Sequence, residues 1–308
     1  MMQGKLDGIV VAPITPMNRD LSVDWVGLEE LVSFLISRGI DGLTACAVTA
    51  ETEGLSMEEH RRVLERTVSV VGGRVPVYCG VGRTSILEAR ELVAFVEALG
   101  GDGLFVITPY ASAYTGDEVV AYLRDIAMRS RLPLMMYNCP GYAGVNITVE
   151  RITQLSQIDN VVAIKEGNQE QLPALVAATR GSAFKVFTAR DSYLLDSLDG
   201  GAAGVISFAG NVAPDLLVDL YGAWRTGDRN RAEQLQASVT RLVGALVTRS
   251  YPLFIKAAMA ELGLPAGPAR RIEGGLDRAE QAAVRTCLNE VVGGWRYERP
   301  DRRAATVP

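Results

Sequence analysis

Short apolar runs alternate with longer amphipathic segments along most of the chain, which has 308 residues. Each apolar run is closed by a turn residue or a polar segment, which is typical of parallel strands buried on both faces. The pattern predicts strands at residues 8–14, 40–48, 75–81, 103–108, 134–137, 161–165, 184–188 and 204–207.

The segments between these strands carry the spacing and the end signals of helices. Three of them open on a capping-box sequence, in which Ser56, Ser85 or Thr115 is followed three residues later by a glutamate. Asn168 and Gln171 are expected to cap the helix behind the sixth strand. We expect the three capping-box helices at about 56–71, 85–99 and 115–129. The remaining helices are expected at about 24–38, from 148, 192–198, 214–225, 229–248, 252–262 and 277–292.

Eight strand–helix units in about 225 residues match the size and the count of a (β/α)8 TIM barrel. A doubly wound sheet is the alternative, but Gly80 and Gly82 lack the third glycine of a dinucleotide-binding fingerprint. The sequence therefore predicts an α/β barrel at 1–226. A C-terminal helical appendage at 227–292 is expected to pack on it as part of the same domain, followed by a frayed tail at 293–308.

One lysine stands in an unusual place, at the end of the sixth apolar run. The chain has only four lysines, at positions 5, 165, 185 and 256, and lysine is almost never fully buried without a partner or a function. Burial lowers the pKa of a lysine, and a neutral amine can attack a carbonyl to form an imine. The alternative is that Lys165 reaches the strand mouth and pairs with Glu166.

The fifth strand favours the imine interpretation. Catalytic groups of such barrels lie at the C-terminal ends of the strands, and this strand ends at Tyr137. Adjacent strands lie about 4.8 Å apart, so Tyr137 and Lys165 are expected to meet inside the barrel. A tyrosine beside the lysine can move protons during imine formation.

The other strand ends supply expected substrate contacts. Thr49, with the backbone N–H groups of the surrounding loop, is expected to hold a carboxylate. Arg190 is either an anion ligand or a solvated charge. The loop neighbours Val48 and Ala50 and the fourth-strand Tyr110 complete the expected contacts from this end of the barrel.

Composition excludes several classes of function. The net charge of −5 argues against nucleic acid or an anionic membrane as the main partner, and no apolar run reaches the length of a membrane span. The four cysteines form no CxxC pair, and the single histidine is His60, so we expect no metal site, no cofactor and no histidine-based catalysis. Reduced cysteines and the lack of a signal-peptide pattern predict a cytoplasmic protein.

Several motifs together resemble the dihydrodipicolinate synthase/N-acetylneuraminate lyase family. They are Tyr137-Asn138-Cys139-Pro140, Ile164-Lys165-Glu166 and Gly204-Val205-Ile206-Ser207. The resemblance implies a (β/α)8 barrel that assembles as a homotetramer or dimer and forms an imine with pyruvate or a related 2-oxo acid. It assigns the imine to Lys165, acid–base work to Tyr137, carboxylate binding to Thr49 and a backbone carbonyl near the imine to Ile206.

The chain departs from the synthase pattern at three positions. Val48 stands where the synthase has a threonine that relays protons, and Ala111 stands where a tyrosine completes that relay across a subunit interface. Tyr142 occupies the place of the arginine that binds the semialdehyde substrate. Tyr114 is a possible replacement for the relay tyrosine, at a different spacing.

These observations predict an imine-forming lyase, an aldolase or dehydratase acting on pyruvate or a related 2-oxo acid. The missing groups indicate a second substrate less anionic than that of the synthase, such as part of a sugar-derived or aromatic 2-oxo acid. The first alternative is 4-hydroxy-tetrahydrodipicolinate synthase of lysine biosynthesis with altered relay residues. The second is a barrel that binds a 2-oxo acid without catalysis.

Overall fold

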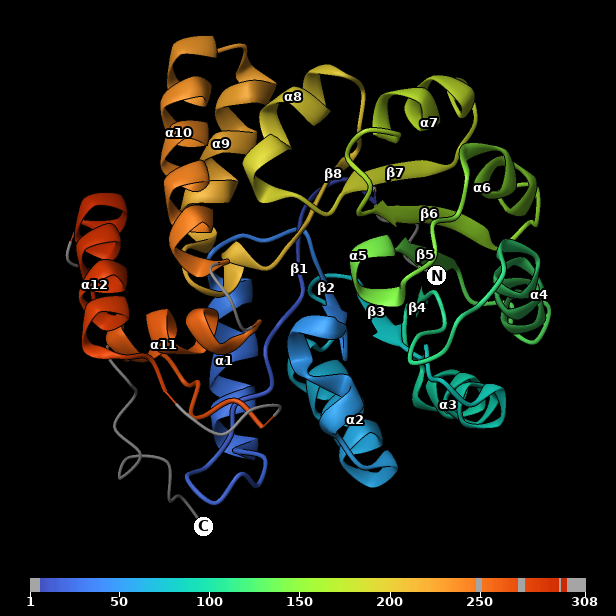
Figure 1. The fold of residues 1–308 in the computed structure, drawn as a ribbon, viewed down its shortest axis with the longest axis horizontal. Coiled ribbons are helices and arrows are strands. Elements are labelled where there is room, and N and C mark those ends of the chain that lie inside the picture. Colours follow the sequence, from blue (N-terminus) through green and yellow to red (C-terminus); the bar gives the residue numbers. More distant parts are fainter. Residues whose placement is uncertain (1–5, 248–250, 271–274, 294, 298–308) are drawn as a thin grey trace.

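Eight parallel strands close into a barrel in chain order, as predicted (Figure 1). A computed structural model describes residues 6–247, 251–270, 275–293 and 295–297. The strands are β1 Gly8–Val11, β2 Gly42–Ala45, β3 Val77–Gly80, β4 Gly103–Ile107, β5 Leu134–Asn138, β6 Val161–Glu166, β7 Lys185–Thr188 and β8 Gly204–Ser207. Each strand residue is buried except Val162 and Lys185, which explains the continuous apolar runs.

Most strands are shorter than their apolar runs, because some apolar residues are buried in loops instead. The first run was expected to reach Ile14, yet β1 ends at Val11. Ile14 lies in the following loop, where its backbone N–H donates to the Asn211 side chain over 2.9 Å. Hydrophobicity predicts burial at such positions and leaves the backbone pairing open.

The helices surround the barrel and continue past it. They are α1 Trp25–Ser37, α2 Met57–Val71, α3 Ile86–Leu99, α4 Gly116–Ala127, α5 Pro140–Ala143, α6 Val149–Leu155, α7 Leu172–Ala178, α8 Leu194–Asp199, α9 Pro214–Thr226, α10 Arg229–Leu246, α11 Leu253–Glu261 and α12 Arg278–Val292. Four short 3-10 turns lie in the loops, at η1 Val48–Ala50, η2 Thr52–Gly54, η3 Asp191–Tyr193 and η4 Ala209–Asn211.

The helix-start signals were largely right. Reciprocal capping boxes form at Ser56 and Thr115, whereas Ser85 accepts a backbone hydrogen bond from Glu88 as a simple cap. The predicted capping of α7 by Asn168 and Gln171 is wrong. Gln171 occupies the N-cap position, but its side-chain oxygen accepts from the Asn146 amide at 3.0 Å, and its amide nitrogen donates to the Ile147 carbonyl and to the buried Glu166 carboxylate.

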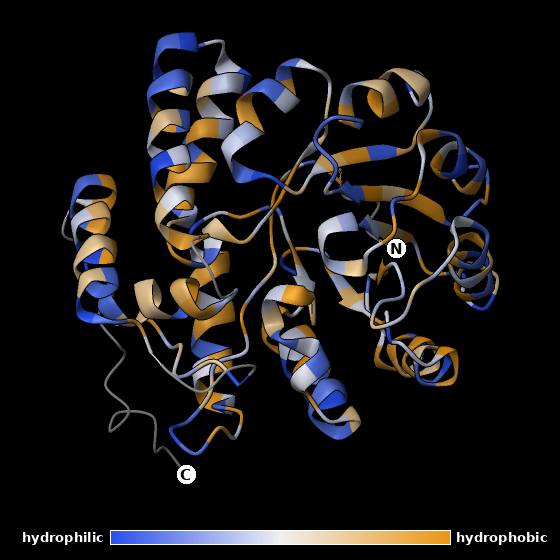
Figure 2. Cartoon of the chain, viewed as in Figure 1, coloured by the Kyte–Doolittle hydropathy of each residue, from blue (hydrophilic) through white to orange (hydrophobic). Residues whose placement is uncertain are grey.

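Two hydrophobic clusters hold the molecule together. The larger one lies between the sheet and the helices, and the smaller one fills the barrel with side chains such as Phe105, Tyr137 and Phe187. Figure 2 shows hydrophobic residues concentrated in the strands and along one side of the surrounding helices. The interior of the barrel is therefore filled with side chains, and a substrate site can form only at an end of the barrel.

The C-terminal helices extend the structure on one side of the barrel (Figure 1). Helix α10 lies alongside α9 and also packs against α12 and the η3 turn. Thr248, the last residue of the helix predicted at 229–248, lies outside the described residues, as do Gly294 and residues 298–308 of the predicted tail. Among the described helices, none is both long and apolar enough to cross a membrane.

Candidate active site

Lys165 lies inside the C-terminal end of the barrel, as the strand pattern predicted. Its Cα pairs in register with Tyr137 of β5 and with Phe187 of β7, and the side chain is 5% exposed. Burial lowers the pKa of Lys165 to about 8, because the charged ammonium loses its hydration. The amine is therefore a nucleophile close to neutral pH.

Tyr137 forms one wall of the lysine's surroundings. The Lys165 Nζ lies 4.4 Å from the centroid of the Tyr137 ring, and that ring stacks on Phe105 at 5.5 Å between centroids. Burial raises the pKa of Tyr137, and the adjacent side chains of Cys139 and Tyr251 raise it further. The phenol thus keeps its proton until a reacting group can take it.

Glu166 faces away from Lys165, contrary to the ion-pair alternative. Successive side chains of a strand point to opposite faces. The Glu166 carboxylate accepts hydrogen bonds from the Asn138 amide at 2.8 Å, the Gln171 amide at 2.9 Å and the backbone N–H of Asn168 at 2.6 Å. Burial raises the pKa of Glu166 to about 7, and these donors oppose the rise. The motif after the lysine therefore braces the loops behind β5 and β6.

The loop after β2 presents Thr49 to the same space. The Thr49 hydroxyl is buried and shares a hydrogen bond of 2.6 Å with the hydroxyl of Tyr251. Behind it, the Ala50 carbonyl accepts a hydrogen bond from Thr15, and the Glu51 carboxylate forms a 2.6 Å ion pair with Lys256 of α11. The loop is anchored to the barrel and to the C-terminal helices at once.

A buried carboxyl group, that of Asp191, lies near Lys165. Asp191 of η3 is completely buried, and its pKa is raised by that burial, while the nearby Ser207 hydroxyl and the Lys165 charge oppose the rise. Gln236 of α10 donates to the Asp191 backbone carbonyl at 3.1 Å and so ties the turn to the C-terminal helices. The electrostatic effect of Asp191 raises the pKa of Lys165 against the larger effect of burial, and Glu166 has no such effect on Lys165.

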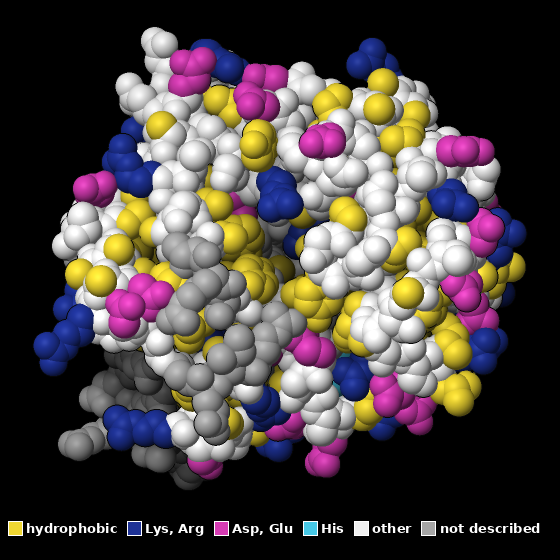
Figure 3. Space-filling model, viewed as in Figure 1, with side chains coloured by type: hydrophobic (Ala, Val, Ile, Leu, Met, Phe, Trp, Pro, Cys, Tyr) yellow, Lys and Arg dark blue, Asp and Glu magenta, His cyan; other side chains and the backbone are white. Residues whose placement is uncertain are grey.

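These groups line one cavity of about 370 Å³ at the C-terminal ends of the strands. Figure 3 shows the hollow near the middle of this face, with hydrophobic side chains on both sides of it. Of the predicted site residues, the cavity brings together Lys165, Tyr137, Thr49, Val48, Tyr142 and Arg190. Their catalytic and binding roles remain predictions.

The remaining predicted residues lie outside this cavity. Tyr110 packs against Tyr142 at 5.3 Å between ring centroids and lines a small adjoining cavity. Ala50 is buried behind the loop, and Ile206 is buried inside the barrel. Tyr114 lines a separate cavity with Tyr122 and does not line the Lys165 cavity of its own chain.

Sequence reasoning missed several residues that line the cavity. Tyr251 follows α10, and Val243 and Val247 belong to that helix and its C-terminal end. No local pattern marks them, because each resembles ordinary helix or loop sequence. A whole-chain alignment of the Tyr251-Pro252 segment with relatives would be needed to connect it with the barrel mouth.

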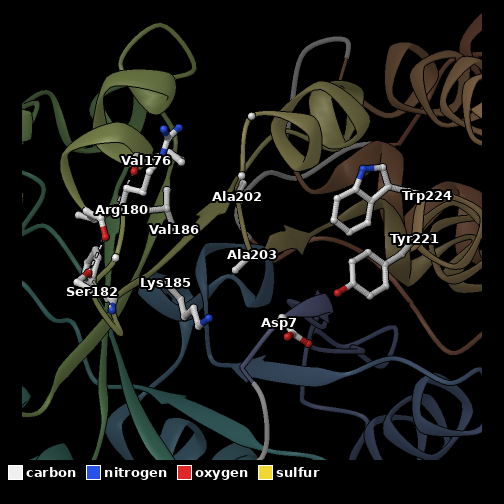
Figure 4. Close-up of a pocket in the computed structure, with 15 residues that line it drawn as sticks. Asp7, Val176, Arg180, Ser182, Lys185, Val186, Ala202, Ala203, Tyr221 and Trp224 are labelled. Atoms are coloured by element: carbon white, nitrogen blue, oxygen red, sulfur yellow. Dashed lines mark hydrogen bonds between the residues drawn. The ribbon is translucent and has the colours of Figure 1, made fainter. Parts of the chain in front are cut away.

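Another cavity, of about 400 Å³, opens at the opposite end of the barrel (Figure 4). It contains Lys185, which begins β7 and is exposed. The figure shows Lys185 on one side and the stacked Tyr221 and Trp224 on the other, with Asp7 between them near the Tyr221 hydroxyl. Catalytic groups of these barrels lie at the other end, which makes Lys185 a suitable control for Lys165.

In the described ranges, no group of three or more His, Cys, Asp or Glu is placed to hold a metal ion.

Comparison with known proteins gives a consistent result over nearly the whole chain. The sequence model of the Dihydrodipicolinate synthetase family matches residues 5–291. A relative from Methanoculleus marisnigri, named 4-hydroxy-tetrahydrodipicolinate synthase, is 35% identical over 92% of this chain and 98% of its own.

Solved structures show the same fold. Dihydrodipicolinate synthase from Acinetobacter baumannii, crystallised with pyruvate, has a TM-score of 0.88 at 31% identity, covering 93% of this chain and 99% of that one. YagE, a prophage protein of the family from E. coli K12 that was also crystallised with pyruvate, has a TM-score of 0.89 at 28% identity, covering 94% and 99%. The chain therefore belongs to the dihydrodipicolinate synthetase family and is an enzyme of the class I aldolase and lyase type.

Proposed function

We propose that this protein forms an imine between Lys165 and the ketone carbon of pyruvate or a related 2-oxo acid. The observation that carries the proposal is the buried amine at the C-terminal end of β6, whose pKa is lowered to about 8. The Thr49 hydroxyl and the loop N–H groups would hold the carboxylate of the substrate. The protonated imine then serves as the electron sink for an enamine, so that the neighbouring bond can be made or broken.

The residues that line the cavity favour a second substrate, or a leaving part of the substrate, that is less anionic than the semialdehyde of the synthase. Its outer wall is apolar, formed by Val243, Val247, Phe208 and Tyr193, and Lys165 and Arg190 are the two cations among the described lining residues. An apolar wall favours burial of hydrocarbon or aromatic surface. We therefore propose aldol cleavage or dehydration of an aromatic 2-oxo acid. A sugar-derived 2-oxo acid is the alternative, because it is also less anionic than the semialdehyde, although the apolar wall does not favour its hydroxyl groups.

Reduction by borohydride tests the imine directly. The protein is incubated with pyruvate and borohydride, and its intact mass is measured, with Lys165→Ala and Lys185→Ala as a matched pair. We expect one reduced pyruvyl group on the wild type and on Lys185→Ala, and none on Lys165→Ala. An adduct that survives Lys165→Ala, or no adduct with any 2-oxo acid, would overturn the proposal.

The second candidate is 4-hydroxy-tetrahydrodipicolinate synthase itself, because the relative reported above carries that name. The residues at the mouth argue against it, since Val48 has no hydroxyl and Tyr142 is not an arginine. Complementation of a lysine auxotroph separates the two candidates. Growth of the auxotroph would favour the synthase, whereas cleavage of a longer 2-oxo acid without growth would favour the lyase.

We also propose that the protein is a cytoplasmic homo-oligomer, either a tetramer or a dimer. The four cysteines, all within the described residues, are unpaired, which supports a reducing compartment. Light scattering of the purified protein would measure the assembly. Binding without catalysis, the remaining alternative, is disfavoured because the chain belongs to a family of enzymes.

A further inference from the structure

A tyrosine from the C-terminal region reaches the cavity and contacts the predicted carboxylate-binding loop. Tyr251 and Thr49 are 202 residues apart in the chain, and their hydroxyl oxygens lie 2.6 Å apart. The Tyr251 ring packs edge-on against Phe208, with 5.7 Å between ring centroids and 82° between planes. This contact places the ring independently of the hydroxyl.

Several hydroxyl groups line the cavity that holds Lys165, and three of them concern proton transfer. Tyr137, Thr49 and Tyr251 all line the cavity that holds the lysine. Tyr251 is close enough to Tyr137 to raise the pKa of that phenol, after the larger effects of burial and Cys139. Hydroxyls in such a cluster can pass protons to one another, because each can donate and accept.

The expected relay groups of the synthase are absent from this cavity. Val48 lines the cavity with a side chain that has no hydroxyl and cannot transfer a proton, and Ala111 is an exposed alanine. Tyr114, the replacement considered from the sequence, lines another cavity. A buried phenol that has given up its proton still needs a route by which a new proton reaches it.

We propose that the Tyr251 hydroxyl, paired with Thr49, returns protons to Tyr137 during imine formation and so provides a relay within a single chain. The inference rests on the proposed imine chemistry of Lys165. It assigns to the C-terminal region a part of the reaction that the family resemblance assigns to a tyrosine across a subunit interface.

The proton balance defines the step. The lone pair of the Lys165 nitrogen forms the C–N bond, the carbonyl electrons move to oxygen, and one nitrogen proton moves to that oxygen to give a carbinolamine. Tyr137 donates a second proton to the hydroxyl, which leaves as water while the nitrogen lone pair forms the iminium. Tyr251 then gives its proton to the Tyr137 phenolate and takes one up from bulk solvent at the cavity mouth, so that one solvent proton balances the charge of the iminium.

The variant Tyr251→Phe removes the hydroxyl and keeps the ring against Phe208. We expect imine formation with pyruvate, followed by quenching with borohydride and intact mass, to slow by about 100-fold, the lower range for loss of a positioned proton donor. The concentration of pyruvate for half-maximal rate should change little. Tyr221→Phe, at the opposite end of the barrel, is the matched control, and its rate should equal that of the wild type.

Rescue separates proton transfer from simple positioning. Small buffer acids such as imidazolium should restore part of the Tyr251→Phe rate in proportion to their concentration and should leave the wild type unchanged. A wild-type rate of imine formation in Tyr251→Phe would overturn the relay. A slower rate that buffer acids do not restore, with a change only in the pyruvate concentration for half-maximal rate, would also overturn it. If the wild type itself forms no adduct, the proposed function fails and the relay fails with it.

Discussion

At the scale of single residues, the direction in which each side chain of β6 points decides the chemistry. Lys165 points into the barrel and lies over the Tyr137 ring, while Glu166 points outward to Asn138 and Gln171. If the strand were shifted by one residue, the carboxylate would face the cavity and the amine would face the helices. The lowered pKa of Lys165 follows from this placement, because burial penalises the ammonium.

The pKa predicts how imine formation depends on pH. With a pKa of about 8, roughly a tenth of the Lys165 amine is neutral at pH 7, about 300-fold more than for a lysine of ordinary pKa. The rate of adduct formation with pyruvate should rise about tenfold per pH unit below pH 8 and level off above it. Quenched-flow mass spectrometry from pH 6 to 10 measures this profile. A rate that continues to rise up to pH 10 would show that the amine is not shifted.

At the scale of elements, a buried ion pair joins the loop after β2 to helix α11. The Lys256 ammonium contacts the Glu51 carboxylate at 2.6 Å and donates to the Pro268 carbonyl at 2.9 Å, and both charged side chains are 1% exposed. Burial lowers the pKa of Lys256, and the charge of Glu51 opposes that shift. The pair positions the turn that carries Thr49, so it links stability with substrate binding.

Removing one partner of this pair should be costly. We expect Lys256→Met to lower the free energy of unfolding by about 3–5 kcal/mol, because Glu51 would remain buried without its countercharge. Urea unfolding measures the loss, and Lys185→Met at an exposed site should change it by less than about 0.5 kcal/mol. Adding Glu51→Gln to Lys256→Met should recover part of the stability. If Lys256→Met and Lys185→Met had the same free energy of unfolding, the role of the pair would be contradicted.

His60 provides a pH-dependent link between α2 and β3. Its Nε2 donates to the Gly80 carbonyl at 2.8 Å, and burial lowers the pKa of His60 to about 4. Between pH 6.5 and 4 the unfolded chain therefore binds more protons at this residue, so its contribution to stability falls as the pH falls, by about 3 kcal/mol in total. Glu166, whose pKa is raised to about 7, acts in the opposite direction between pH 7 and 4.5.

The variant His60→Gln isolates the histidine contribution. The stability difference between wild type and variant should shrink by about 3 kcal/mol on going from pH 6.5 to pH 4, since only the wild type pays for charging the imidazole. Urea titrations at several pH values measure this difference. A difference independent of pH would show that His60 titrates normally in the folded protein.

At the scale of the whole molecule, the barrel and the C-terminal helices build one cavity. Val243, Val247 and Tyr251 line it together with strand-end residues, and Gln236 of α10 donates to the backbone of Asp191. The appendage predicted at 227–292 therefore contributes directly to the site, which supports the prediction of one domain.

That prediction can be tested by unfolding and by truncation. We expect a single calorimetric transition for the full chain, because α10 packs on α9 and on the η3 and η4 turns. A chain that ends at Gly227 should fail to give a cooperative transition, since apolar surface of α9 would face water. Two separate transitions, or a stable truncated barrel, would show that the appendage is an independent unit.

The sequence by itself determined the order of the elements and the residues at the strand ends. Strand and helix periodicity is a local property, so the eight-strand barrel, Lys165 and Tyr137 were predictable, and their pairing in register is confirmed. Local signals failed where two uses of one side chain competed, as at Gln171, whose oxygen accepts from Asn146 and does not cap α7.

Only the tertiary structure decided which distant residues join the site. The Thr49–Tyr251 contact and the Glu51–Lys256 pair each span about 200 residues, and they exist because α10 and α11 pack against the mouth of the barrel. Tyr114 is near the synthase position in sequence yet lines another cavity. Packing of non-local surfaces sets such contacts, and no periodicity along the chain encodes them.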